Sequence, residues 1–283
     1  MIRYRSYAKL NLFLDITGID GPLHTLDMVM QSVSLYDELT FEPLLENRVE
    51  IVCDNVDLQS NNIIEKAFRL TQRVFPQIRQ GFRVTLNKKI PMGAGLAGGS
   101  GNAAATVHYL LTQNHIKPSP KWLRPLLLSI GSDVAFCYRG GTQRVRGVGD
   151  VLRSYQSPHR HFLIVSPHIA VSSAEAYRLW DAFDVRGGRS EEPAKDPHRP
   201  YNAFEQIIFP LYPEIARLKS RLLDLGATEA LMSGSGSAVF GIFKTKDQCE
   251  QAEKQLNDKR YSTWVVRGMS LGVSRLKDVE YSC

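Results

Sequence analysis

A run of small residues at positions 90–105, IPMGAGLAGGSGNAAA, constrains the fold of this chain more than any other stretch. It follows an alternating pattern, FRVTLNKKI, that predicts a strand, and it leads into NAAATVHYLLTQNH, which predicts a helix. Glycines between a strand and a helix let backbone N–H groups approach a ligand, and the helix start adds unpaired donors and partial positive charge. Ser100 offers a hydroxyl, and Asn102 is expected to cap the helix. The stretch therefore predicts a phosphate-binding loop.

Two other interpretations of the same glycines are weaker. Gly93, Gly95 and Gly98 spell the G-x-G-x-x-G pattern of a dinucleotide-binding turn, which needs an acidic residue about 20 positions later. Here Pro91 interrupts the approach, and no acidic residue follows before Asp133. The Walker A loop requires a Gly-Lys pair, which this chain lacks. A flexible connector remains the alternative, although strand and helix patterns rarely flank a connector so closely.

The charge distribution around the loop is one-sided. The chain carries a formal net charge of +6, and no Asp or Glu occurs between Glu65 and Asp133. The basic residues of this interval are Lys66, Arg69, Arg73, Arg79, Arg83, Lys88, Lys89, Lys117, Lys121 and Arg124. They form either a field that attracts phosphates or an ordinary solvated basic face. Because they are not interleaved with aromatic residues, as a stacking platform would require, no nucleic-acid partner is expected.

Composition places the chain among globular proteins. It has 283 residues, 43 % of them hydrophobic and 23 % charged, which suits one large domain or two ordinary ones. We see no membrane-spanning run and no secretory signal, so we expect a cytoplasmic protein without a membrane partner. The four cysteines are scattered and never form C-x-x-C, which indicates reduced thiols and no metal cluster.

The remaining patterns mix strand pairs with helices. AKLNLFLDI at 8–16 predicts a strand, and a helix is expected from Asn61 or Asn62 to Val74. Pro125 is expected to disturb or shorten the helix that follows Ser119. Residues 185–200, rich in Gly and Pro, predict a mobile loop. Regular βαβ alternation is lacking, so an α+β fold is preferred to a doubly wound sheet.

Three motifs occur in order along the chain: AKLNLFL at 8–14, PMGAGLAGGSGNAAA at 91–105 and LMSGSGSAVFG at 231–241. In this order they resemble the GHMP small-molecule kinase superfamily. Further matching stretches are DGPLHTLDMVMQSVSLYDELTF, GSDVAFCYRGGTQRVRGVGD and VSSAEAYRLW, so the resemblance covers nearly the whole length. It implies a two-domain α+β fold with the active site in the inter-domain cleft. The expected domains are residues 1–155 and 156–283.

The resemblance also implies an activity. It points to transfer of the γ-phosphoryl group of ATP, accompanied by Mg²⁺, to the 2-hydroxyl of an erythritol unit linked to cytidine diphosphate, a step towards isoprenoid precursors. The alternatives are a GHMP kinase that acts on another small alcohol and, from a different class, a non-catalytic nucleic-acid-binding protein, for which the basic interval would be the motivation. The expected partners are ATP and the small-molecule substrate, and the expected state is a monomer or a homodimer.

Each motif of the superfamily carries expected roles. The residues matching the ATP-phosphate loop are Pro91, Met92, Gly93, Ala94, Gly95, Leu96, Ala97, Gly98, Gly99, Ser100 and Gly101. Asp133 matches the catalytic aspartate and Lys9 its lysine partner. An alcohol is a weak nucleophile at neutral pH, so Asp133 would accept its proton. Lys9 would stabilise the carboxylate and offset charge on the transferring group.

The substrate side is matched more sparsely. Asn11 and His24 fall in the substrate region, with His24 near the cytosine, and Tyr177 matches an aromatic that stacks on that base. The third motif, with Gly234, Ser235 and Gly236, supports the closed cleft. Three positions depart from the usual pattern: Leu23 stands where a tyrosine commonly packs on the cytosine, Ala97 replaces a glycine and Gly101 replaces a serine.

Overall fold

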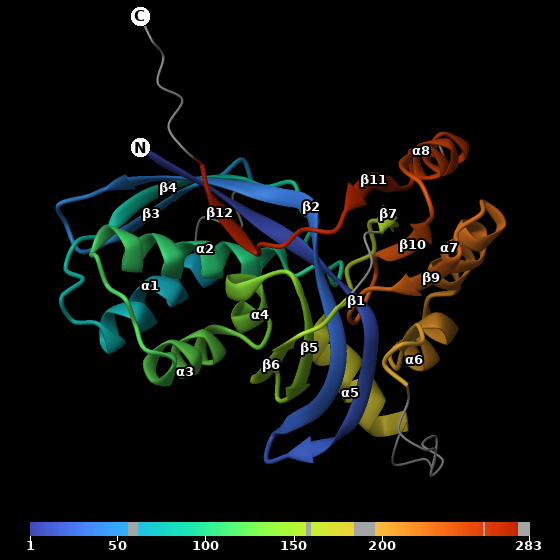
Figure 1. Cartoon of the computed structure of the whole chain (residues 1–283), viewed down its shortest axis with the longest axis horizontal. Helices are drawn as coiled ribbons and strands as arrows, with labels where there is room; N and C mark the ends of the chain where they lie inside the picture. The colour runs from blue at the N-terminus through green and yellow to red at the C-terminus, as the bar shows by residue number, and fades with distance from the viewer. Residues whose placement is uncertain (56–61, 157–159, 184–195, 257, 277–283) are drawn as a thin grey trace, which may run out of the picture.

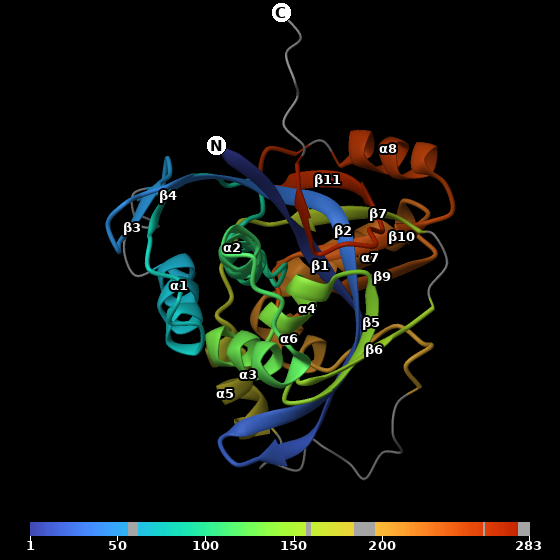
Figure 2. The ribbon, with the colours of Figure 1, turned by 60° about the vertical axis from the view of Figure 1, so that its left-hand side comes forward.

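A computed structural model describes residues 1–55, 62–156, 160–183, 196–256 and 258–276 of the chain. Helices and two mainly antiparallel sheets share the molecule, which confirms the α+β prediction (Figure 1). Each sheet is covered by its own layer of helices. The long hairpin formed by the first two strands extends alongside both sheets (Figures 1 and 2).

The first sheet is built on a long hairpin of β1 (Ile2–Asp20) and β2 (Leu23–Pro43). The central strand order is β12–β1–β2–β4–β3, with β5 and β6 continuing from β2 and β8 pairing with β1. The added strands are β3 (Val49–Val52), β4 (Phe82–Asn87), β5 (Thr142–Gly147), β6 (Val151–Ser154), β8 (Tyr201–Asn202) and β12 (Val273–Arg275). The register of this hairpin shifts at Tyr7/Ala8, Asn11/Phe13 and Ile16/Gly18. Such irregularities bend a strand pair, so the hairpin can extend along both sheets.

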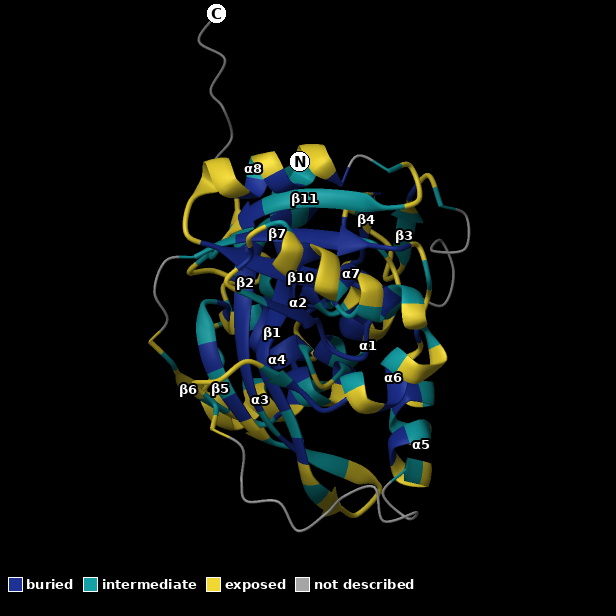
Figure 3. Cartoon of the chain, turned by 90° about the vertical axis from the view of Figure 1, so that its right-hand side faces the viewer, coloured by how far each residue is buried: buried dark blue, intermediate teal, exposed yellow. Residues whose placement is uncertain are grey.

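The second sheet is smaller and has four strands in the order β11–β7–β10–β9. The strands are β7 (His161–Ser166), β9 (Glu229–Met232), β10 (Val239–Phe243) and β11 (Ser262–Arg267). Helices α7 (Pro213–Asp224) and α8 (Lys246–Gln255) pack on it. Figure 3 shows β7 and β10 buried beneath helices whose outer faces are exposed. This arrangement gives the second lobe its own apolar layer.

The remaining helices surround the first sheet and the space between the sheets. They are α1 (Ile63–Val74), α2 (Gly98–Gln113), α3 (Pro120–Ile130), α4 (Val134–Arg139), α5 (Ser173–Phe183) and α6 (Glu205–Leu211). Helix α2 packs against β1 and lies beside α1 (Figure 2). Its residues Ala103, Ala104 and Ala105 are completely buried, because their small side chains let the helix approach its neighbours closely.

Several local predictions can be compared with this structure. Asn62 caps α1 as expected, since its Oδ1 accepts a hydrogen bond from the Ile64 N–H at 3.0 Å. The capping prediction for Asn102 is wrong, because α2 already begins at Gly98 and Asn102 lies inside it. Its Oδ1 instead accepts a hydrogen bond from Ser6 Oγ at 2.7 Å, joining α2 to β1. Pro125 lies within α3 without ending it.

Other predictions concern the second lobe and the thiols. Most of the loop predicted at 185–200 falls outside the described residues. The division of the chain after residue 155 stays a prediction, while β8 and β12, which follow that point, both pair with β1. Cys53, Cys137 and Cys249 are buried thiols, not disulfides. In the described part of the chain, no helix combines the length and apolar character needed to cross a membrane.

Candidate active site

A cavity of about 530 Å³ is formed by β1, the glycine loop, the start of α4, α5 and the turn between β9 and β10. Most of the residues predicted for the site line it: Lys9, Asn11, all positions from Pro91 to Ser100, Asp133, Tyr177, Gly234 and Ser235. Gly101, His24 and Gly236 are not part of the lining. Motifs separated by more than 200 residues of sequence therefore meet around one space.

Lys9 and Asp133 stand together in this cavity. Lys9 projects from β1 and is almost fully buried, and its Nζ donates a hydrogen bond to Asn11 Oδ1 at 2.5 Å. Its Nζ also lies 3.8 Å from Asp133 Oδ2. Asp133 immediately precedes α4, and its side chain keeps 29 % exposure. A buried lysine is stabilised by such partners, and the accessible carboxylate is free to meet a hydroxyl group.

The glycine loop is held in place by the third motif. Gly95 has a φ of +73°, and its carbonyl oxygen accepts a hydrogen bond from Ser233 Oγ at 3.0 Å. The Ala238 N–H donates to the Ala94 carbonyl at 3.2 Å. Beyond these contacts the chain enters α2 at Gly98, whose first turn presents free N–H groups. The loop is thus preorganised as an anion site at the start of a 16-residue helix.

Gly95→Ala is expected to lower the free energy of unfolding by about 3 kcal/mol, because a methyl group strains the left-handed backbone and overpacks the loop. A Cβ at this position would lie 1.9 Å from the Ser233 carbonyl oxygen. Urea denaturation measures the loss. The control is Gly21→Ala, where φ is +59° but no atom lies within 4 Å of the added Cβ. Equal losses in the two variants would show that the contact with Ser233 contributes nothing.

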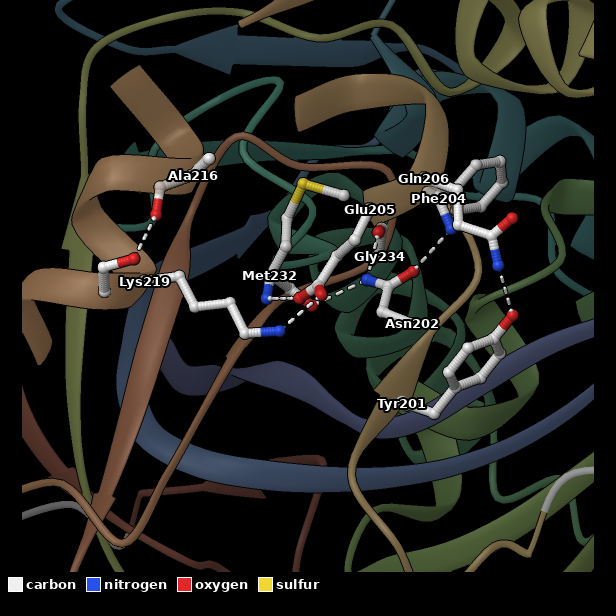
Figure 4. Close-up of polar contacts among 10 residues, drawn as sticks. Tyr201, Asn202, Phe204, Glu205, Gln206, Ala216, Lys219, Met232 and Gly234 are labelled. Atoms are coloured by element: carbon white, nitrogen blue, oxygen red, sulfur yellow. Dashed lines mark hydrogen bonds and ion pairs between the residues drawn. The ribbon is translucent and has the colours of Figure 1, made fainter. Parts of the chain in front are cut away.

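The turn of the third motif is braced from β8 and α6. The buried Asn202 donates hydrogen bonds from Nδ2 to the carbonyls of Met232, at 2.7 Å, and Gly234, at 2.8 Å (Figure 4). Glu205 Oε1 accepts from the Met232 N–H at 2.9 Å, and Lys219 Nζ lies 2.5 Å from Glu205 Oε2. Neither Asn202 nor Glu205 could be predicted from the sequence, since neither belongs to a motif. Asn202 acts on the site by fixing two backbone carbonyls behind it, and Glu205 by fixing a backbone N–H group.

Lys88 and Asp37 were also missed as a pair. Asp37 is completely buried, and its Oδ1 accepts hydrogen bonds from the N–H groups of Lys89 and Ile90, each at 2.8 Å. Its Oδ2 lies 2.9 Å from Lys88 Nζ, and Lys88 lines the cavity. The acid therefore anchors the chain just before the glycine loop and holds a second cation beside it. The basic interval in the sequence pointed to Lys88, but the buried acidic partner of this lysine lies some 50 positions earlier.

Part of the basic interval is neutralised by acidic residues outside the cavity lining. Arg69, Arg83 and Arg124 pair with acidic residues, at 2.5 Å, 2.7 Å and 3.1 Å. From the interval, Lys88 is the residue whose charge reaches the cavity lining in the described structure. The local field at the loop thus comes from Lys9, Lys88 and the start of α2, rather than from the basic interval as a whole.

Two stacked rings lie at the edge of the cavity, and of the two only Tyr177 is part of its lining. The imidazole of His24, at the beginning of β2, lies 4.6 Å from the ring of Tyr177 on α5, with 20° between the planes. Tyr177 also meets Phe204 edge to face at 5.0 Å. Burial raises the pKa of the Tyr177 hydroxyl, and the charge of Asp133 raises it further, so this phenol stays neutral. Leu23 is 55 % exposed and contributes no aromatic face here.

This combination of fold, phosphate loop and lysine–aspartate pair defines a small-molecule kinase of the GHMP class. Residues 62–141 match the GHMP kinases N terminal domain, and residues 189–262 match the GHMP kinases C terminal model. A relative from Thermoanaerobacter pseudethanolicus, named 4-diphosphocytidyl-2-C-methyl-D-erythritol kinase, is 33% identical over 91% of this chain and 92% of its own length. One of the same name from Desulfitobacterium hafniense is 36% identical over 94% and 96%. The chain belongs to the 4-diphosphocytidyl-2-C-methyl-D-erythritol kinase family.

Solved structures agree with this assignment. A crystal structure of 4-(cytidine 5'-diphospho)-2C-methyl-D-erythritol kinase superimposes with a TM-score of 0.77 and 28% identity, covering 94% of this chain and 99% of the other. Homoserine kinase from Cytophaga hutchinsonii gives a TM-score of 0.70 at 18% identity, covering 97% of each chain. The second likeness shows a shared fold alone.

Proposed function

We propose that this protein transfers the γ-phosphoryl group of ATP to the 2-hydroxyl of 4-diphosphocytidyl-2-C-methyl-D-erythritol. The observation that carries the proposal is the placement of Lys9 and Asp133 in one cavity with the glycine loop. The names of relatives that match over nearly the whole chain support the choice of substrate. A cytoplasmic location and a monomeric or homodimeric state stay predictions.

Within this proposal, each group of residues has its own part in the reaction. The partly exposed Asp133 carboxylate accepts the proton of the substrate hydroxyl as the new oxygen–phosphorus bond forms. Lys9 holds that carboxylate and balances negative charge on the transferring group. The N–H groups of the loop and of the first turn of α2 bind the phosphates of ATP. Positioning and charge neutralisation supply most of the rate in phosphoryl transfer.

The donor groups of the cavity fit a Mg²⁺ ion that arrives with ATP. Mg²⁺ binds through one or two carboxylates together with substrate phosphates, and Asp133 is the carboxylate in the described lining. Among the described residues, no group of three or more His, Cys, Asp or Glu side chains could hold a metal by itself. When bound, the ion neutralises phosphate charge, with Asp133 and the Ser100 hydroxyl as its candidate protein ligands.

A coupled assay of ADP release tests the proposal. The purified protein is incubated with Mg-ATP and a panel of alcohols that contains the cytidine diphosphate substrate, homoserine and mevalonate. We expect stoichiometric ADP release with the cytidine compound, and phosphorus NMR should place the new phosphate on the 2-hydroxyl. Turnover of another alcohol without turnover of this one would leave a GHMP kinase with a different substrate.

A further inference from the structure

An acidic side chain outside the predicted site holds His24 in position. His24 Nε2 forms a hydrogen bond of 2.6 Å with Oδ1 of Asp181, which lies on α5 one turn after Tyr177. The His24 side chain is only 14 % exposed, whereas that of Asp181 is 51 % exposed. The imidazole is therefore fixed by two contacts from the same helix, a hydrogen bond at its edge and a ring at its face.

The hydrogen bond also decides which ring nitrogen carries a proton. An ionised carboxylate can only accept hydrogen bonds, so the proton of a neutral His24 lies on Nε2. Nδ1 then keeps its lone pair and is an acceptor. A ring nitrogen acceptor pairs with an amino group and is repelled by a carbonyl oxygen. Cytosine carries an exocyclic amino group at the position where uracil carries a carbonyl.

We propose that Asp181 is a positioning residue that makes His24 selective for a cytosine base over uracil. The proposal rests on the proposed function, because it assumes that the base binds at the His24–Tyr177 end of the site. Asp181 acts by holding the neutral Nε2–H tautomer, which leaves Nδ1 to accept a hydrogen bond from the amino group of the base. His24 thereby recognises the base in a chain whose preceding residue, Leu23, has no aromatic ring to pack on it.

Steady-state kinetics with Asp181→Asn test the proposal. The assay compares the cytidine diphosphate substrate with its uridine analogue. We expect the variant to raise KM for the cytidine substrate about tenfold, with kcat within about twofold of the parent. The ratio of kcat/KM for cytidine over uridine should fall about tenfold, because the amide of asparagine binds either tautomer. Asp181→Glu should restore part of the preference.

The control is Glu175→Gln on the same helix, whose carboxylate pairs with the exposed Arg178 instead. It should leave KM and the base preference unchanged. A purely structural role of Asp181 would raise KM for both bases equally, and this result would overturn the proposal. If the parent enzyme turns over another alcohol but not the cytidine substrate, the proposed function fails and this inference falls with it.

Nitrogen NMR of the histidine rings gives a second measurement that needs no substrate. In the parent protein, His24 should show the Nε2–H tautomer, and Asp181→Asn should show a mixture of both tautomers. A ring protonated on both nitrogens under the assay conditions, or an unchanged tautomer in the variant, would overturn the proposal even if catalysis on the cytidine substrate is confirmed.

Discussion

Asp133→Asn is expected to lower kcat by a factor of about 10² to 10⁴, the range that general-base catalysis usually contributes. Asparagine keeps the size of the side chain at the start of α4 but cannot accept the proton of the substrate hydroxyl. Among the described residues, no hydrogen bond of the phosphate loop depends on this carboxylate, and asparagine keeps one oxygen that can contact Mg²⁺, so the affinity for ATP should stay within a few fold. ADP release measures kcat, and equilibrium nucleotide binding measures the affinity.

The matched control for this variant is Asp224→Asn, which removes an exposed carboxylate at the end of α7, away from the cavity lining. It should leave kcat unchanged. Near-parental turnover of Asp133→Asn would remove the general-base role and leave positioning and charge as the sources of the rate.

Lys9→Met is the second variant with a large expected effect, a fall in kcat of about 10² to 10³. Methionine fits the buried space but removes the cation that lies 3.8 Å from Asp133 Oδ2. It also leaves Asn11 Oδ1 without its donor at 2.5 Å. Because the charge on the phosphoryl group develops beside this position, most of the loss should appear in kcat rather than in the affinity for ATP.

Lys66→Met controls for the removal of a lysine that is exposed but also forms a hydrogen bond to another part of the chain. Lys66 Nζ donates to the Ile130 carbonyl at 2.7 Å, outside the cavity lining. This variant should lose some stability to heat while keeping its kcat. If Lys9→Met slows the reaction no more than Lys66→Met does, Lys9 is a structural lysine.

Much of the fold could be predicted from local patterns in the sequence. The apolar periodicity of α1 and its Asn62 cap lie within a dozen neighbouring residues, so short-range rules were enough to find them. The full length of β1 was not predicted, because its bulges break the alternation on which strand prediction depends. Helix α4 has only 6 residues, which are too few to show a helical periodicity of apolar residues. Its place beside α2 and α3 is decided by tertiary packing.

For the site, the difference lies between residues in motifs and residues that brace them. Lys9 and Asp133 were identified because they stand inside contiguous matching stretches. Asn202 and Asp37 hold backbone groups that are about 30 to 50 positions away in sequence. Asp181 meets His24 across 157 positions. Such contacts form only after the sheets and helices have packed, so no local sequence pattern predicts them.

The bent β1–β2 hairpin works as a fixed spacer between the two ends of the site. Lys9 stands near the middle of β1, and His24 stands at the beginning of β2, so one hydrogen-bonded strand pair carries both. A ladder of this kind does not stretch, because each residue adds a set rise of about 3.3 Å. In the proposed function the acceptor spans the distance from Lys9 to His24, so we expect a short alcohol to reach the lysine and leave the histidine empty, forfeiting the remote binding energy that aligns the hydroxyl. We therefore expect the backbone of the hairpin to select acceptors by their length.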